Sequence, residues 1–434
     1  MSGPNFEGLF GKSGGLPGWM AQTRLRPGFF SRVRRLAGYL GPAFIVSVAY
    51  VDPGNFATNI SGGSKFNYDL LWVILWGNLM AIFLQSVSAK LGIAAGMSLP
   101  EMCARVFPRS VNWCLWIMAE TAAMATNLAE FLGGALGLHL LFKLPLAYAG
   151  VLTGALTCFI VHLEKYGQRA LETVVTAFVA VICAAYGVEL FLAKPDWAAV
   201  GTHMLTPSLA GGEAVLVAAG MLGATVMPHV IYLHSQLVQS RKTPDTCGQK
   251  LRHYKLEKTD IAIAMNIAFL VNAAMVVVAA SVFYAEGIEV KSIEQAHHSL
   301  SPLLGSLSSG AFAIALLASG VSSSVVGTMA GQTVMKGFVN LKIPVAVRRI
   351  AAMAPALAVI LLGADPVKSL IISQVVLSFA LPAAIVPLML ITGRKDIMGP
   401  LVNGRLTNSF GWVIAALVIG LNAVLLFLTF TGNI

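Results

Sequence analysis

Long apolar runs alternate with short polar segments along most of the chain. The runs fall at residues 38–62, 69–96, 112–141, 146–163, 173–193, 213–239, 260–285, 303–337, 345–363, 367–391 and 410–431. A helix needs about 20 apolar residues to cross the hydrocarbon core of a bilayer. The pattern therefore predicts an all-α integral membrane protein with eleven transmembrane helices in one domain, 38–434, after a flexible cytoplasmic tail, 1–37.

Composition and charge support this interpretation and exclude other classes of protein. Of the 434 residues, 57% are hydrophobic and 11% are charged, whereas a soluble domain carries roughly 25% charged residues. The net charge of +10 comes from Lys and Arg that lie between the apolar runs, and a nucleic-acid surface would need them clustered on a folded scaffold. We therefore expect a protein that contacts the lipid bilayer and binds no nucleic acid.

The distribution of Lys and Arg predicts the orientation in the membrane. With the N-terminus in the cytoplasm, 24 of the 29 lie on the cytoplasmic side, and the other five are Lys65, Lys143, Lys194, Lys291 and Lys368. Cytoplasmic segments carry the excess of positive charge. We expect a multi-pass protein of the plasma membrane, or of the inner membrane in a Gram-negative cell, with its C-terminus outside.

No cofactor is predicted from the cysteines or from the N-terminal segment. The five cysteines form no CxxC pair of the kind that holds a structural metal. The segment Gly11-Lys12-Ser13 lacks the glycine that a phosphate-binding loop requires at position 6, which is Phe6. We therefore expect neither a nucleotide site nor an ATPase subunit.

The first apolar run is interrupted in its middle by Asp52-Pro53-Gly54-Asn55. Proline has no amide hydrogen, so the carbonyl of Ala49 loses its helical partner. Irregular backbone at membrane depth is tolerated only where it is buried in protein or lines a cavity. A packing kink is the alternative, but a kink requires neither Asp52 nor Asn55.

The sixth run contains a second interruption, Gly223-Ala224-Thr225-Val226-Met227-Pro228-His229. Two interrupted segments in corresponding places of two halves indicate the midplane site of a secondary transporter. We therefore expect a first repeat, 38–193, and a second repeat of opposite topology, 213–392, with an additional helix at 409–431.

The two interruptions together offer a set of ligands for a cation. The set contains the carboxylate of Asp52, the amide oxygen of Asn55, the thioether of Met227 and the freed carbonyls of Ala49 and Ala224. Hard Mg²⁺ and Ca²⁺ prefer oxygen ligands, whereas a thioether favours softer ions. The set favours Mn²⁺ or Fe²⁺, although a methionine in an apolar helix is often core filler.

Few acids lie inside the apolar runs, where a charge costs roughly 2.5–3.5 kcal/mol. Asp52, Glu120 and Glu130 are the acids that we expect there. Glu120, Asn127 and Glu130 share one face of the third helix. With Arg348 or Arg349 they form either a proton path or a static hydrogen-bonded seam.

Two histidines of the sixth run are candidates for proton transfer. Imidazole titrates near pH 6.5, and His229 directly follows the second interruption. His234 lies five residues further on, so the pair lacks the spacing of a metalloprotease zinc site. The alternative for either histidine is a hydrogen-bonded interior residue.

The paired motifs Asp52-Pro53-Gly54-Asn55 and Met227-Pro228-His229 resemble those of the Nramp family of proton-coupled divalent-metal transporters, in particular its bacterial manganese-uptake branch. The resemblance covers about 40–430. Further similar stretches are Phe56-Ala57-Thr58-Asn59, Ala123-Met124-Ala125-Thr126, Val230-Ile231-Tyr232-Leu233-His234-Ser235 and Ser373-Gln374.

The resemblance implies a LeuT-type 5+5 inverted repeat with broken helices 1 and 6. It implies a metal site formed by Asp52, Asn55, Met227 and the carbonyls of Ala49 and Ala224, which Gln374 joins as metal enters or the site closes. The positions that match family residues tied to proton movement are His229, Glu130 and Arg349. Bacterial relatives usually carry an aspartate where this sequence has Asn127.

The expected function is secondary active import of Mn²⁺, and of Fe²⁺ as well, with protons by alternating access. The protein is expected not to be an enzyme, because Asp52 has no second aspartate in a facing helix and no Ser–His pair can be assigned. The alternatives are a metal uniporter with weak proton coupling, a magnesium transporter and a sodium-coupled amino-acid carrier on the same fold. A bare carboxylate at Asp52 argues against an anionic substrate group.

Overall fold

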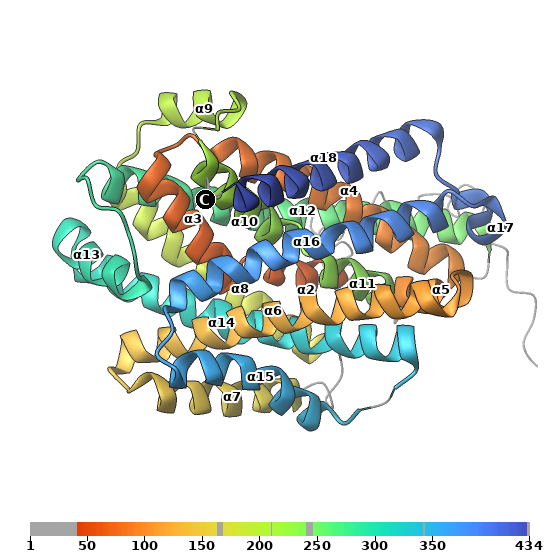
Figure 1. Ribbon diagram of the computed structural model, residues 1–434, viewed down its shortest axis with the longest axis horizontal. Coiled ribbons are helices and arrows are strands. Elements are labelled where there is room, and N and C mark those ends of the chain that lie inside the picture. Colours follow the sequence, from red (N-terminus) through yellow and green to blue (C-terminus); the bar gives the residue numbers. More distant parts are fainter. Residues whose placement is uncertain (1–40, 163–167, 210, 240–245, 342, 432–434) are drawn as a thin grey trace, which may run out of the picture. The chain divides into compact units, whose positions relative to one another are not determined.

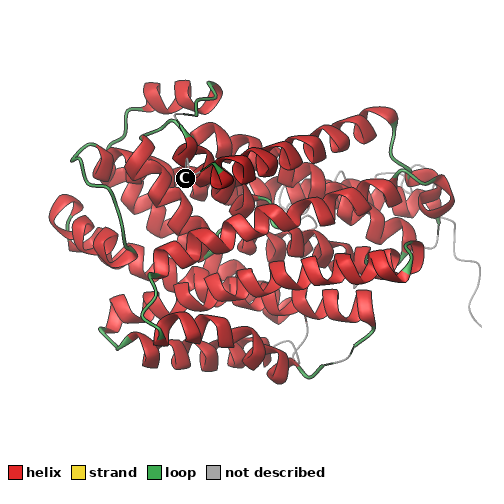
Figure 2. Ribbon diagram, viewed as in Figure 1, coloured by secondary structure: helices red, strands yellow, loops and turns green. Residues whose placement is uncertain are grey.

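The computed structural model describes residues 41–162, 168–209, 211–239, 246–341 and 343–431. The tail predicted for 1–37 lies outside them. The described residues form helices and connecting loops without a strand (Figure 2), as the apolar runs predict.

Both interruptions break their helices at the expected residues. The first run divides into α2 (Pro42–Ala49) and α3 (Pro53–Phe66), and the sixth into α10 (Gly212–Thr225) and α11 (Pro228–Leu237). Each second half begins with a proline, because the first turn of a helix needs no amide donor there. In Figure 1 these four half-helices lie in the interior of the bundle, where α10 contacts α3 and α11 contacts α2.

The other nine apolar runs also form helices. These helices are α4 (Leu71–Ala95), α6 (Arg109–Phe142), α7 (Leu146–His162), α8 (Gln168–Ala193), α12 (Cys247–Ala279) with its π-helical end η2 (Ala280–Tyr284), α14 (Ser306–Val339), α15 (Val345–Leu361), α16 (Pro366–Thr392) and α18 (Arg405–Phe430). Eight segments of the described chain are long and apolar enough to cross a membrane, with α10 and α11 counted as one. The first run is broken, and α7 and α15 are short, so the count of eleven crossings stays a prediction.

Four shorter helices between the runs were not expected from hydropathy. They are α5 (Leu99–Val106), α9 (Trp197–Leu205), α13 (Ile293–Leu304) and α17 (Lys395–Met398), and a 3-10 turn, η3 (Gly399–Leu401), follows the last one. Two of the predicted helix starts also differ from the structure. Helix α12 begins at Cys247 rather than near 260. Its first turns are polar, so the apolar pattern does not indicate them. Helix α14 begins at Ser306 rather than 303, because Gly305 adopts a φ of 93° that ends α13.

Helices α6 and α14 pack most extensively against each other and support the broken helices. Gly320 of α14 lies so close to the backbone of Gly134 in α6 that a Cβ at Gly320 would collide with it. Glycine is needed at such a close approach. This contact fixes the two helices beside the breaks.

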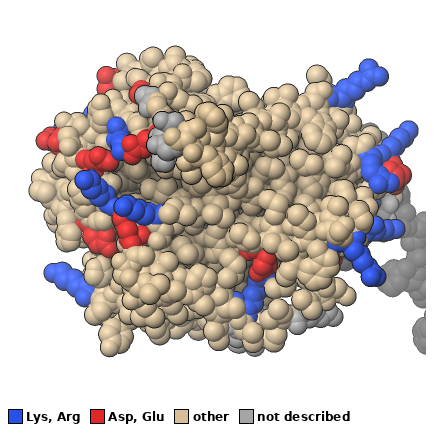
Figure 3. Space-filling model, in the orientation of Figure 1, with Lys and Arg blue, Asp and Glu red and all other residues tan. Residues whose placement is uncertain are grey.

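Charged side chains separate toward the two ends of the bundle (Figure 3). On the face shown, acidic side chains gather mainly at the end that carries α9 and α13, whereas basic side chains predominate at the end that carries α5 and α17. The wide band between them is almost free of charge, as a surface in contact with lipid tails requires.

Candidate metal site

The two helix breaks free the same backbone group by the same means. The helical partner of the Ala49 carbonyl would be the amide of Pro53, and that of the Ala224 carbonyl would be the amide of Pro228. Neither proline has an amide hydrogen. The last turn of α10 closes with a bond from the Val226 amide to Leu222. Each break therefore leaves one carbonyl without its helical partner.

Asn55 connects the two breaks through its side chain. Asp52 Oδ1 accepts hydrogen bonds from the backbone amide and the Nδ2 group of Asn55, both at 2.8 Å. Asn55 Nδ2 also donates to the carbonyl of Ala224 at 3.1 Å. These two acceptors determine which end of the amide carries the nitrogen. The remaining oxygen, Asn55 Oδ1, is left for another partner.

Three buried side-chain oxygens at this place accept no hydrogen bond from the described residues. They are Asp52 Oδ2, Asn55 Oδ1 and Gln374 Oε1, and all three residues are fully buried. Buried polar atoms are normally paired. A group of acceptors without donors is suited to a bound cation.

Gln374 of α16 reaches the site because glycines let its helix approach both broken helices. A Cβ on Gly54 at the start of α3 would collide with the Gln374 side-chain amide, and a Cβ on Gly223 in α10 would collide with the Gln374 carbonyl. Gln374 Nε2 donates to Ser373 Oγ at 3.2 Å. The structure thus places Gln374 beside the first break. In the sequence, the resemblance to the Nramp family was the sole reason to expect it there.

Met227 is the N-cap residue of α11 and is fully buried. It lies between the end of α10 and Pro228, so it occupies the second break itself. No group of three or more His, Cys, Asp or Glu side chains in the described chain is arranged to hold a metal. A cation bound here would therefore have one carboxylate and otherwise neutral ligands.

Two polar residues that sequence reasoning missed satisfy the other carbonyls of the first break. Asn272 of α12 donates to the Tyr50 carbonyl at 2.6 Å, and Ser319 of α14 donates to the Val51 carbonyl at 2.5 Å. Their signal was a polar residue inside a long apolar run. The carbonyls of Tyr50 and Val51 thus have donors from other helices, whereas the Ala49 carbonyl lost its helical partner to Pro53.

The two histidines lie in different environments. His229 Nδ1 lies 3.2 Å from Thr126 Oγ1 of α6, and its Nε2 has no partner among the described residues. His234 Nδ1 lies 2.8 Å from Gln85 Oε1, and Gln85 in turn donates to the Tyr50 hydroxyl at 2.6 Å. Both rings are fully buried, so both fit the alternative of interior histidines as well as a proton role.

The polar stripe on α6 is divided into separate contacts. Glu120 forms an ion pair with Arg348, with N–O distances of 2.9 and 3.2 Å. Asn127 donates to the Ala123 carbonyl of its own helix at 2.7 Å. Neither contact joins Asn127 to Glu130, so this part of the stripe resembles a static seam.

Glu130 is fully buried, and neither carboxylate oxygen accepts a hydrogen bond from the described residues. It faces α14 at Gly327, where a Cβ would lie 2.5 Å from Glu130 Oε2. Arg349 donates instead to the Ser324 carbonyl at 2.9 Å and to the Thr328 hydroxyl. Glu130 and Arg349 thus approach the same stretch of α14 without a direct hydrogen bond.

Comparison with known proteins identifies the family. The model of the family Nramp, described as natural resistance-associated macrophage protein-like, matches residues 43–428. The chain belongs to the Nramp family. This confirms the resemblance to the Nramp family that the paired motifs indicated.

Two curated Nramp relatives carry the name divalent metal cation transporter MntH. The protein from Clostridium acetobutylicum is 66% identical over 92% of this chain and 93% of its own length, and the protein from Deinococcus radiodurans is 51% identical over 91% and 90%.

Solved structures agree with the fold. The manganese transporter of Eremococcus coleocola has a TM-score of 0.83 at 32% identity, over 92% of this chain and 88% of that one. The nucleobase-cation-symport-1 transporter Mhp1 has a TM-score of 0.59 at 14% identity, over 89% and 91%, which supports the shared fold alone.

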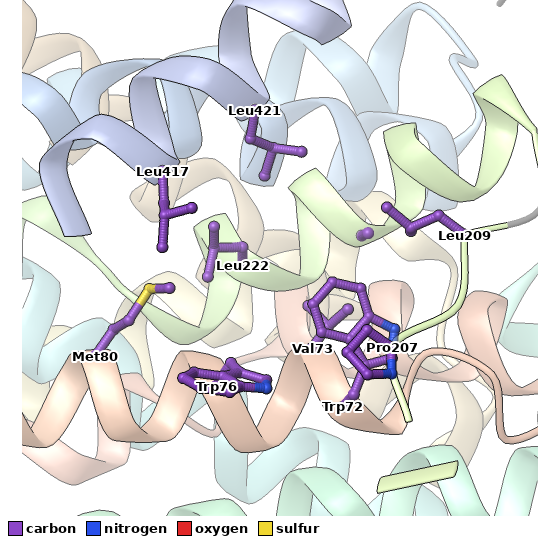
Figure 4. Close-up of a pocket in the computed structure, with 10 residues that line it drawn as sticks. Trp72, Val73, Trp76, Met80, Pro207, Leu209, Leu222, Leu417 and Leu421 are labelled. Carbon is purple, nitrogen blue, oxygen red and sulfur yellow. The ribbon is translucent and has the colours of Figure 1, made fainter. Parts of the chain in front are cut away.

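One cavity at the periphery of this Nramp chain offers no ligand for a metal. This cavity has a volume of about 340 Å³ and lies between α4, α10 and α18. Figure 4 shows Leu417 and Leu421 on one side of it and Trp76 on the opposite side. Every side chain that lines it is apolar or aromatic. Such a groove is suited to lipid tails and provides no ligand for an ion.

The expectation that Asp52, Glu120 and Glu130 are the acids inside the bundle is incomplete. Glu189, Glu257 and Asp260 are also at least 98% buried. Asp260 Oδ2 accepts from the amides of Gly41 and Ala43, both at 3.2 Å, and so caps α2. Their positions near the ends of apolar runs made these acids look exposed.

Proposed function

We propose that this Nramp protein is a secondary active transporter that imports Mn²⁺, and Fe²⁺ as well, with protons by alternating access. The buried oxygens of Asp52 and Asn55, together with the freed carbonyls of Ala49 and Ala224, carry this proposal. Met227 adds a soft ligand that Mg²⁺ and Ca²⁺ do not favour. The names of the relatives, divalent metal cation transporter and manganese transporter, support the same class of substrate.

In this proposal the two breaks provide the moving parts. Asp52 binds the metal and accepts a proton, and Gln374 joins the ligands as the site closes. His229 and Glu130 take the proton onward, with Arg349 as a nearby cation. The contrast between the paired Glu120 and the unpaired Glu130 supports this assignment, because a carboxylate without a fixed partner is the one free to exchange a proton.

We further propose that the N-terminus is cytoplasmic, the C-terminus is outside, and the protein lies in the plasma membrane, or the inner membrane of a Gram-negative cell. The bias in Lys and Arg and the separation of charge in Figure 3 support this orientation. An inside-negative potential then drives cation entry, by about 2.3 kcal/mol per elementary charge for 100 mV.

Proton coupling is tested by uptake into proteoliposomes. Wild-type protein is reconstituted with a pH dye inside, Mn²⁺ outside and an imposed inside-negative potential. We expect Mn²⁺ uptake together with internal acidification, and neither in protein-free liposomes. Uptake of Mn²⁺ without acidification would contradict coupling and make the protein a uniporter.

The substitution Asn127→Asp is expected to change the pH dependence of uptake more than the affinity for Mn²⁺. Among the described residues, the amide donates to Ala123 of its own helix and to none of the proposed metal ligands, whereas a carboxylate there can exchange protons beside Glu130. Uptake rate and half-saturating Mn²⁺ are measured across a pH series, with Asn127→Gln as the control. An unchanged pH profile would exclude position 127 from the proton route.

A further inference from the structure

Two lysines from different helices lie against one tyrosine ring at the basic end of the bundle. Lys90 Nζ, near the end of α4, and Lys258 Nζ, in the polar first part of α12, are each 6.0 Å from the centre of the Tyr254 ring. A cation within about 6 Å of an aromatic ring is attracted to the ring face. The two ammonium groups therefore share Tyr254 as a neighbour.

Lys90 is a buried cation whose hydrogen-bond partner is neutral. Its residue is only 6% exposed, and its ammonium donates to the side-chain oxygen of Asn403. Asn403 is itself fixed, because its Nδ2 donates to Thr392 Oγ1 at 2.8 Å. Lysine is almost never buried unless it is paired. The nearby charge of Lys258 has the same sign as that of Lys90 and repels it.

The described acids at this end have other partners. These pairs are Glu101 with Ser98, Glu257 with His253, Asp260 with the amides of Gly41 and Ala43, and Asp396 with Arg394. Among the side chains that the structure describes, no carboxylate forms an ion pair with Lys90 or Lys258. The two positive charges thus remain without a counter-ion from this part of the protein.

We propose that Lys90 and Lys258 bind the phosphate group of an anionic phospholipid beside Tyr254. Both α4 and α12 belong to candidate membrane spans, and Lys258 lies just before the apolar part of α12, so the pair is at the level of lipid head groups. A phosphodiester carries one negative charge that its two non-bridging oxygens share, and both oxygens can accept hydrogen bonds from ammonium groups. Basic pockets between membrane helices bind such head groups.

Native mass spectrometry of the full-length protein tests this site. The protein is equilibrated in detergent with equal amounts of phosphatidylglycerol and phosphatidylcholine, and the lipid that stays bound is counted. We expect selective retention of phosphatidylglycerol. A lysine near an anionic surface contributes about 1 kcal/mol, so Lys258→Gln is expected to weaken retention roughly fivefold and the double variant Lys90→Gln with Lys258→Gln roughly thirtyfold.

Lys395→Gln is the matched control, since Lys395 is exposed at the same end and does not contact Tyr254. It is expected to retain phosphatidylglycerol as the wild type does. Equal loss in Lys395→Gln would show diffuse attraction and overturn the site, as would wild-type retention by the double variant. Lys258 is exposed, so its single variant separates lost binding from misfolding.

Inorganic phosphate distinguishes a lipid from a soluble anion. We expect it to displace phosphatidylglycerol weakly and to leave the thermal stability of the wild type unchanged, whereas vesicles of phosphatidylglycerol raise that stability. Stabilisation by inorganic phosphate but not by these vesicles would overturn the lipid assignment. Mn²⁺ uptake by Lys258→Gln in pure phosphatidylcholine liposomes is expected to match the wild type, because Lys258 is remote from both breaks.

Discussion

Asp52→Asn is expected to abolish binding and uptake of Mn²⁺. Among the described residues, Asp52 is the carboxylate that lies at the breaks with an unpaired oxygen, Oδ2, and no described cluster of His, Cys, Asp or Glu could replace it. Loss of an outer partner of a metal ligand already costs roughly 10–100-fold in affinity. Loss of the charged ligand itself should therefore exceed about 100-fold, measured by titration calorimetry and by flux into proteoliposomes.

The asparagine variant keeps the local fold and so isolates the charge. Asp52 caps α3 by accepting from the Asn55 amide, and asparagine is an equally good N-cap residue. The control is Glu120→Gln, which removes a half-buried carboxylate that is already paired with Arg348. We expect that control to retain Mn²⁺ binding. Wild-type affinity in Asp52→Asn would remove Asp52 from the metal site.

The broken helices were predictable because their cause is local. A proline four residues after Ala49, and another four residues after Ala224, removes one amide donor in each case, and no tertiary contact can restore it. The match between the two breaks also indicated the repeats. Their exact division at 38–193 and 213–392 stays a prediction, as does the tail at 1–37.

Hydropathy alone does not mark the polar and amphipathic helical segments, such as α5 and the first turns of α12. Thr246 and Gln249 form a capping box at the start of α12, and Ser98 and Glu101 form one at the start of α5. Both patterns are visible in the sequence and mark a helix start. The capping box at Thr246 and Gln249 thus indicates that α12 begins well before the apolar run.

The candidate ligands could be named from the sequence, but their supporting contacts could not. Asp52 and Asn55 lie three residues apart in the chain, so their interaction is local. The donors to Tyr50 and Val51 come from Asn272 and Ser319 on two other helices. Which helix faces which break depends on packing throughout the bundle, and a single sequence has no local signal for it.

Met227→Ala is expected to reduce discrimination between Mn²⁺ and Ca²⁺ by about tenfold, or about 1.4 kcal/mol. The substitution leaves the oxygens of Asp52 and Asn55 in place, and such oxygens accept Ca²⁺ as readily as Mn²⁺. It removes the one soft donor at the second break. Competition of Ca²⁺ with Mn²⁺ uptake measures this change, and a magnesium transporter would instead show little change in preference.

A matched methionine separates selectivity from the loss of packing. Met221 is also fully buried, in α10, where its sulfur lies near Gly62 rather than at the break. Replacement of a buried methionine by alanine costs about 2–5 kcal/mol of stability at either position. We therefore expect Met221→Ala to lower stability to a similar degree and to keep the preference for Mn²⁺. If both variants admit Ca²⁺ equally, the effect comes from loosened packing, and Met227 is not a selective ligand.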